Sequence, residues 1–242
     1  MKRILSIFFV GLFIVSLAAS PLFAQTANDI IAEMVKAQGG AELFKSIKDM
    51  TMTGTIELVQ QGLSGSLTIY KKEPNKRRLD VEVMGMVFTQ AYDGTIAWWI
   101  NPQTGAVEEM NEQQTAETKR QALPIVSILN PEKYGLSFTY NGKEQIEGKD
   151  YFVLEEAFAD GFKATLYVDT ETYLVYKSKA TTIGPYGNEV EVEEISADYI
   201  KIGGMNFPHL ITSYYDGQEY SVITIGEVTF NKGLEDSLFK ME

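Results

Sequence analysis

Apolar and polar residues alternate along most of the chain after residue 50. In the first half the alternating apolar residues are Met52, Ile56, Leu58, Leu67, Ile69, Leu79, Val81, Val83, Met86 and Phe88. A period of two is typical of antiparallel strands that bury one face and expose the other. The connections are short and leave no room for the crossover helices of a parallel sheet. The pattern therefore predicts an antiparallel meander.

The pair Asp93-Gly94 predicts a two-residue hairpin turn in this meander, because glycine accepts the positive φ that such turns require. The strand that follows would carry Ile96, Trp98 and Ile100 on one face and Trp99 on the other. A hairpin with large aromatic residues at its centre indicates the middle of a wide sheet.

Two regions depart from the alternating pattern. Residues 26–47 show helical spacing, with a cap supplied by residues 26–29 and a stop at Gly39-Gly40, and they predict a helix of about three turns followed by a short second one. Residues 112–130 contain strong helix formers and then an apolar stretch that includes Leu123, Ile125, Val126 and Leu129. A segment that is apolar on all sides is either a plug in the core or a lid over an apolar cavity, and both interpretations stay open.

Turn sequences recur through the second half at Asn141-Gly142, Glu147-Gly148, Asp160-Gly161, Gly203-Gly204 and Asp216-Gly217. We expect about eleven strands in total, and a sheet of that width must curl, close or split. Because no repeat or linker divides the chain, the sequence predicts a mainly β (α+β) protein with a single domain over residues 25–242.

The N-terminus has the features of a secretory signal peptide. Lys2-Arg3 precede an apolar run, and Ser20-Pro21 lead to a cleavage site after Ala24, so we expect residues 1–24 to be removed. A retained anchor helix is the less favoured alternative, because the break comes too early for a membrane span. Position 25 is Gln rather than Cys, which excludes lipidation there. The mature protein is expected to be soluble in the periplasm.

Charge and cysteine content exclude several functions. The net charge is −12, and loss of the two basic leader residues makes it −14, which disfavours nucleic acid and anionic membranes as partners. The chain has no cysteine, so thiol catalysis, disulfides and Cys-ligated metals are excluded.

No catalytic, metal or cofactor site stands out. His209 is the only histidine and lacks partners for a triad, so we interpret it as structural. Glu189, Glu191 and Glu193 share one strand face, where a solvated surface is favoured over a cation site. Asp169 and Glu171 flank a turn, and hydrolysis by such a pair would require opposed carboxylates with separated pKa values.

Two groups of residues are candidate binding sites. A basic cluster contains Lys71, Lys72, Lys76, Arg77 and Arg78, and the last three are candidates for docking a lipid headgroup or an acidic partner. The alternative is a hairpin that uses charge to prevent edge pairing. The candidate lining of an apolar cavity is Leu58, Leu67, Ile69, Val81, Phe88, Trp98 and Ile100. The same residues could instead form a closed core.

Several short stretches, in order, resemble the outer-membrane lipoprotein-sorting family of periplasmic carriers, which is related to LolA, LolB and the lipid-sensing domain of RseB. The matching stretches are Gly39–Leu43, Pro74–Arg78, Tyr92–Gly94 with Trp98 and Asn101-Pro102, Tyr167–Leu174, Asp198-Tyr199 with Gly203–Pro208, and Asn231 ahead of Phe239. The resemblance implies a half-open barrel whose concave face is covered by an N-terminal helix and a mid-chain lid formed by Leu123, Ile125, Val126 and Leu129. It implies a lipid-like ligand. The basic residue by which LolA-type carriers gate the lid has no match in this sequence.

The leading hypothesis is therefore a monomeric periplasmic carrier of a lipid or lipid-modified protein, with a membrane delivery partner and a role in outer-membrane sorting. A cell-envelope sensor or scaffold that binds a protein partner is the second hypothesis. A hydrolase with a carboxylate pair is the third, because a convincing nucleophile, base or metal cluster is missing.

Overall fold

The computed structural model describes residues 25–183 and 188–241, so the expected signal peptide lies outside the described residues. The first half of the sheet is a meander of β1 (Asp49–Leu58), β2 (Leu63–Lys72), β3 (Lys76–Val83), β4 (Met86–Tyr92), β5 (Ala97–Ile100) and β6 (Val107–Glu109). The second half comprises β7 (Leu136–Ile146), β8 (Lys149–Phe158), β9 (Lys163–Asp169), β10 (Val175–Ile183), β11 (Glu189–Ala197), β14 (Leu210–Tyr215) and β15 (Gln218–Phe230).

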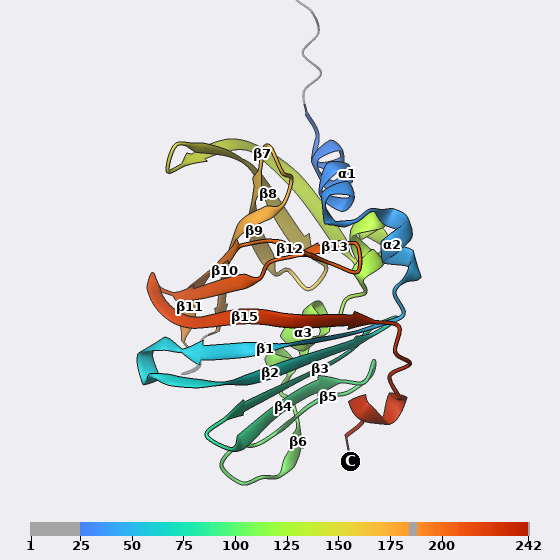
Figure 1. Ribbon diagram of the computed structural model, residues 1–242, viewed down its shortest axis with the longest axis vertical. Coiled ribbons are helices and arrows are strands. Elements are labelled where there is room, and N and C mark those ends of the chain that lie inside the picture. Colours follow the sequence, from blue (N-terminus) through green and yellow to red (C-terminus); the bar gives the residue numbers. More distant parts are fainter. Residues whose placement is uncertain (1–24, 184–187, 242) are drawn as a thin grey trace, which may run out of the picture.

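These strands form one 13-stranded antiparallel sheet in the order β6-β5-β4-β3-β2-β1-β15-β14-β11-β10-β9-β8-β7 (Figure 1). The sheet does not close, and β6 and β7 are its edges. A separate two-stranded sheet pairs β12 (Ile200–Ile202) with β13 (Met205–Phe207). The predicted mainly β class and wide half-open sheet are confirmed. The predicted number of about eleven strands is too small, because strands of only three residues, such as β6, are too short to show alternation.

Helices α1 (Ala27–Gln38) and α2 (Ala41–Ser46) pack on the concave face of the sheet. Thr26 caps α1 through a capping box with Asp29, and Gly39 ends the helix at a φ of 133°. A side chain at Gly39 would also approach the carbonyl oxygen of Gly204 to 2.9 Å. The buried face of α1 and the strands together form the main core. Its buried members are Ile30, Ile31, Met34, Val35, Phe44, Ile47, Met50, Phe152, Leu154, Val168, Met205, Ile225 and Val228.

The strand register separates the two faces of the meander. Met52 pairs with Ile69, and Leu67 pairs with Val81, which pairs in turn with Phe88, so these side chains share the inner face that carries the core. Leu58 lies on the same face of β1 as Met52.

Trp98 and Ile100 lie on the opposite, outer face, so their predicted place in an inward-facing set is wrong. Ala91 opposes Trp98, and Tyr92 opposes Ala97, which leaves a four-residue connection from Asp93 to Ile96 instead of a two-residue turn. Trp99 therefore faces inward with Gln90. Because the side-chain period is two, the inner and outer faces cannot be assigned on β5 until the register of this connection is known.

The mid-chain region folds as α3 (Glu112–Gln121) followed by two 3₁₀ turns, η2 (Ile125–Leu129) and η3 (Pro131–Tyr134). Behind the central strands in Figure 1, α3 packs on β4 and β5 through a small cluster of Tyr92, Ala97 and Ala122. In turn, η2 packs against α1 and α2. The described residues contain no helix long and apolar enough to cross a membrane.

The end of the described chain returns to the outer face of the meander as η4 (Asp236–Phe239) (Figure 1). Phe239 is fully buried, and its carbonyl oxygen accepts a 2.8 Å hydrogen bond from Nε1 of Trp98. Because Trp98 faces outward, its indole N–H can hold this terminal segment on the sheet.

Candidate functional site

The second half of the sheet carries a cavity on its inner face, beneath α3. The cavity has a volume of about 340 Å³. Its floor is small or apolar because Ala164, Leu166, Ala180 and Val192 come from neighbouring strands in register. Its remaining lining consists of Glu117, Arg120, Gln121, Glu156, Phe158, Phe162, Ser178, Thr182 and Glu194. A second cavity of about 440 Å³ lies between α3 and the region around Tyr134 and Phe158.

Carboxylates rather than cations dominate the polar part of the first cavity. Burial raises the pKa of Glu156 to about 7. Burial also raises the pKa of Glu194, and the negative charge of Glu117 adds to the effect. The cavity therefore favours neutral carboxyl groups and presents a mostly apolar surface to whatever occupies it.

Arg120, in the last turn of α3, holds the C-terminal end of the helix against the second half of the sheet. Its Nη1 donates to Asp160 at 2.5 Å, and its guanidinium lies 4.1 Å from the ring centroid of Phe162. The same residue lines both cavities. Since α3 packs on β4 and β5 at its other side, the helix spans the concave side between the two halves of the sheet.

Two charged residues hold the start of the mid-chain apolar segment. Nζ of Lys71 donates to the carbonyl oxygen of Leu123 at 3.2 Å, and Oε1 of Glu73 accepts from the backbone N–H of Ile125 at 3.2 Å. Burial, assisted by the charge of Arg77, lowers the pKa of Lys71 to about 8. Burial raises the pKa of Glu73, although the bond from Ile125 opposes the shift. We call this pair of contacts the 71/73 latch.

The predicted lid residues divide between two environments. Leu123 lines the cavity on one side of α3. Ile125, Val126 and Leu129 are half-buried against the main core beside α1 and α2. Leu129 also lines an open groove of about 550 Å³ between α1 and η3. The segment therefore packs on the main core and also borders two cavities.

The predicted apolar cavity lining is only partly assembled. Leu58, Leu67, Ile69, Val81 and Phe88 share the inner face of the first half, whereas the 340 Å³ cavity is lined by strands of the second half. Sequence reasoning missed the latter residues. The available signal was the small size of alternate residues such as Ala164, Ser178 and Ala180, which leaves space on the inner face.

The predicted docking residues do not form a free patch. Lys76 pairs with Asp236 at 2.9 Å, and Arg78 donates to the carbonyl oxygen of Leu238 at 3.0 Å, so the terminal segment occupies both. Arg77 points to the inner side and is buried, which lowers its pKa to about 10 against the effect of Glu117. Neighbouring residues on a strand face opposite ways, which is why the three cannot act together.

The weaker chemical candidates all have structural contacts. Nδ1 of His209 lies 2.7 Å from the carbonyl oxygen of Ile225. Lys179 pairs with Glu191 at 2.8 Å and with Glu193 at 3.5 Å. Asp169 pairs with Lys149 and accepts the backbone N–H groups of residues 171 and 172. Within residues 25–183 and 188–241, no group of three or more His, Asp or Glu side chains could hold a metal ion.

Comparison with solved structures identifies the architecture. A LolA superfamily protein from Nitrosomonas europaea superposes with a TM-score of 0.62 at 15% identity, over 90% of this chain and 98% of that one. The chain has the LolA fold. A DUF1329 family protein from Desulfovibrio piger gives a TM-score of 0.60 at 15% identity, over 88% of this chain and 95% of that one.

A putative outer membrane lipoprotein-sorting protein domain from Vibrio parahaemolyticus has the LolA fold in common with this chain. Its TM-score is 0.58 at 16% identity, over 88% of this chain and 95% of that one. The sequence itself matches no family model and no curated protein. At these identities the likeness concerns the fold, and the site must be argued from this chain's own residues.

Proposed function

We propose that the protein is an exported carrier of the periplasm that holds a lipid, or the acyl chains of a lipid-modified protein, between α3 and strands β8 to β11. The observation that carries the proposal is the cavity of about 340 Å³ with an apolar floor on the concave face. Burial of acyl chain there would stabilise the complex by roughly 0.8 kcal/mol per CH₂ group. No covalent chemistry is needed.

The way in which α3 is held over this cavity supports a protein that binds and releases its ligand rather than one that retains it permanently. On one side α3 is held by Arg120, and on the other it continues into the segment held by the 71/73 latch. The Arg120 contacts and the 71/73 latch are polar, so the Arg120 end of α3 can move away from the sheet while the apolar packing of η2 on the main core and of Ala122 on Tyr92 and Ala97 stays in place. Opening of this cover is the proposed route for ligand entry and release.

Native mass spectrometry of detergent-free protein, followed by solvent extraction, tests the proposal. We expect an acyl-chain ligand in the wild type. Leu166→Trp should fill the cavity floor and remove most of the ligand. Thr165→Trp is the matched control, because Thr165 is the neighbouring residue on the opposite face of β9, and it should keep the ligand.

An empty wild-type protein would refute the carrier function. Equal ligand content in folded Leu166→Trp and wild type would refute the assignment to this cavity. A reproducible protein partner bound by an empty protein would instead support the sensor or scaffold hypothesis.

A further inference from the structure

Exposed apolar side chains gather at the end of the β3–β4 hairpin. The fractional exposures of Met84, Met86 and Val87 are 73%, 54% and 50%. Among the described residues only Ile96 and Met241 are further large apolar residues classed as exposed, at 36% and 37%. Met86 and Val87 lie on opposite faces of β4, so exposed apolar side chains surround this hairpin end, and the core does not use them.

The backbone at this hairpin end is unfavourable for the residue it holds. Val83 pairs with Met86, so Met84 and Gly85 form a two-residue turn with φ values of 54° and 77°. Turns with two positive φ values favour Asn, Asp or Gly at the first position. A methionine there adds strain, and its exposed side chain gains little packing in return. Such an outlier points to a role for the side chain outside the fold.

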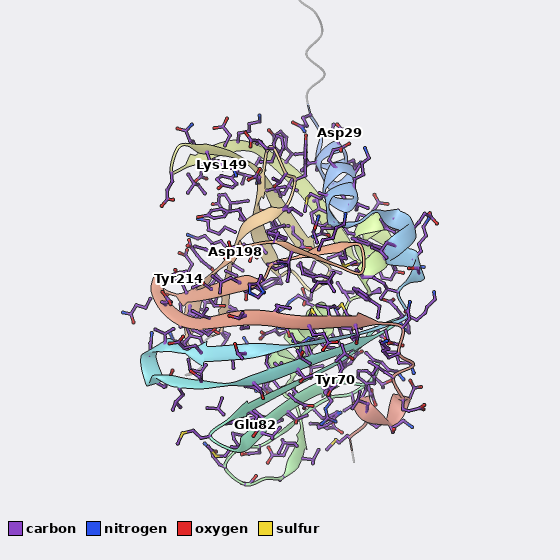
Figure 2. All side chains as sticks on the ribbon, in the orientation of Figure 1. Asp29, Tyr70, Glu82, Lys149, Asp198 and Tyr214 are labelled. Carbon is purple, nitrogen blue, oxygen red and sulfur yellow. The ribbon has the colours of Figure 1, made fainter. Side chains whose placement is uncertain are left out.

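The β1–β2 and β3–β4 hairpin ends themselves carry no charged residue. The register pair Gly65–Val83 places the β1–β2 hairpin end alongside the β3–β4 end. Residues 58–70 and 83–92 contain no charged residue in a chain of net charge −12. Glu57 and Glu82 precede the two uncharged stretches in the sequence, and Figure 2 labels Glu82 near the hairpin end. In the neighbouring β14–β15 hairpin, the carbonyl oxygen of Glu219 accepts a 3.5 Å hydrogen bond from Nε2 of Gln60. The loop 101–106, which follows β5 toward the same end, is also uncharged.

We propose that the ends of the β1–β2 and β3–β4 hairpins form a contact surface for a lipid bilayer of low net charge. The inference rests on the proposed carrier function, which requires exchange of ligand with a membrane. The ends stand in open space, since a Cβ at Gly62 or Gly85 would meet nothing within 4 Å. Separate protruding ends with flexible methionines suit penetration of a soft interface better than docking on a rigid protein.

Charge selects the kind of bilayer. The hairpin ends offer no lysine or arginine to anionic headgroups, and the acidic chain behind them would be repelled by such headgroups. Binding should therefore come from apolar insertion into zwitterionic lipid. The protein should therefore prefer zwitterionic over anionic bilayers, whereas membrane proteins with polybasic segments prefer anionic ones.

Vesicle flotation at low salt tests the inference, with phosphatidylcholine vesicles and with vesicles that also contain phosphatidylglycerol. Wild type should float with phosphatidylcholine, and less with the anionic mixture. Met84→Asp should reduce binding at least about tenfold, because apolar insertion is lost and a charge is added. Aspartate accepts the left-handed backbone better than methionine, so the variant should fold. Ile96→Asp is the control, as Ile96 is exposed in the connection at the other end of β4.

No binding by wild type, equal binding by Met84→Asp, or a requirement for phosphatidylglycerol would overturn the inference. Loss of self-association in Met84→Asp without any vesicle binding would also overturn it and assign the patch to a second copy of the chain. Ligand content separates the two proposals, because Met84→Asp should retain the extracted ligand. If protein without bound ligand still binds vesicles through the hairpin ends, this inference stands and the carrier function fails.

Discussion

At the scale of single residues, Glu156 most clearly distinguishes the cavity from an ordinary core. Its carboxyl faces the cavity beside the apolar floor, and burial is the cause of its raised pKa of about 7. An ionised carboxylate at this position lacks the solvation that water would supply. Glu156 therefore lies on the wall of a cavity and not within the close-packed apolar core.

The stability of the protein should therefore depend on pH through this residue. The ordinary pKa of Glu is 4.5, so between that value and about 7 folding takes up a proton at Glu156. This contribution is most favourable at low pH and is lost as the pH rises through that range. Glu156→Gln should raise the free energy of unfolding above roughly pH 8 by up to about 3 kcal/mol, with little change at low pH.

Denaturant titration at low and high pH measures this difference. Glu155→Gln is the matched control, because Glu155 lies on the other face of β8 and pairs with Lys163 at 2.8 Å. A Glu156→Gln variant whose stability gain does not change with pH would show that the carboxyl is not buried as described.

Some single-residue features could be predicted from the sequence and others could not. The alternation of Leu67, Ile69 and Val81 assigns their shared face without any knowledge of the partner strands. The orientation of Trp98 depends on the four-residue connection before it, and composition does not determine that register. Arg77 and Arg78 look equivalent in sequence, yet one is buried inside and the other binds the terminal segment.

At the scale of elements, the mid-chain segment was recognisable as apolar and helical but its attachments were not. The 71/73 latch joins residues that are about fifty positions apart, and such a pairing is set by the sheet rather than by local sequence. Opposite charges that each hold one backbone group give the segment a defined position.

Removing the latch should loosen the segment without unfolding the protein. In Lys71→Ala/Glu73→Ala, amide exchange at Ser127 and Asn130 should accelerate about tenfold or more, because two hydrogen bonds to buried charged groups are lost. These amides donate within the segment, to Pro124 and Ser127, so they report its opening.

Lys72→Ala is the control for this experiment, since Lys72 binds the terminal segment through the carbonyl oxygen of Leu234. Global stability need not fall in the double variant, because burial of the two charges is itself unfavourable. If exchange changes only at Ile125, the latch does not control the segment.

At the scale of the whole molecule, the fold class was accessible from the sequence because alternation extends over nearly every long strand. The open antiparallel sheet with helices follows the expected half-barrel, whereas the strand order, with β1 beside β15, was not predicted. The location of the cavity was not accessible, since it depends on small residues of β9 and β10 meeting across the register. The terminal segment also escaped prediction because its contacts are mainly to backbone atoms.

That segment should contribute strongly to overall stability. Phe239 is fully buried against the outer face of the meander, and Phe239→Ala should lower the free energy of unfolding by about 3–5 kcal/mol. Ser237→Ala, an exposed change in the same turn, should have little effect. Denaturant unfolding of both variants measures the contribution, and a loss below about 1 kcal/mol for Phe239→Ala would contradict tight anchoring.

The pairing of β1 with β15 has a consequence for how the chain acquires its structure. The two halves of the sheet meet where the first strand joins the last, so that seam cannot form until nearly the entire polypeptide has been delivered. Until then the meander of β1 to β6 presents the unpaired edge of β1 to its surroundings. Such long-range closure slows folding and lengthens exposure to aggregation. The folding of this protein should therefore be limited by the docking of β15 against β1.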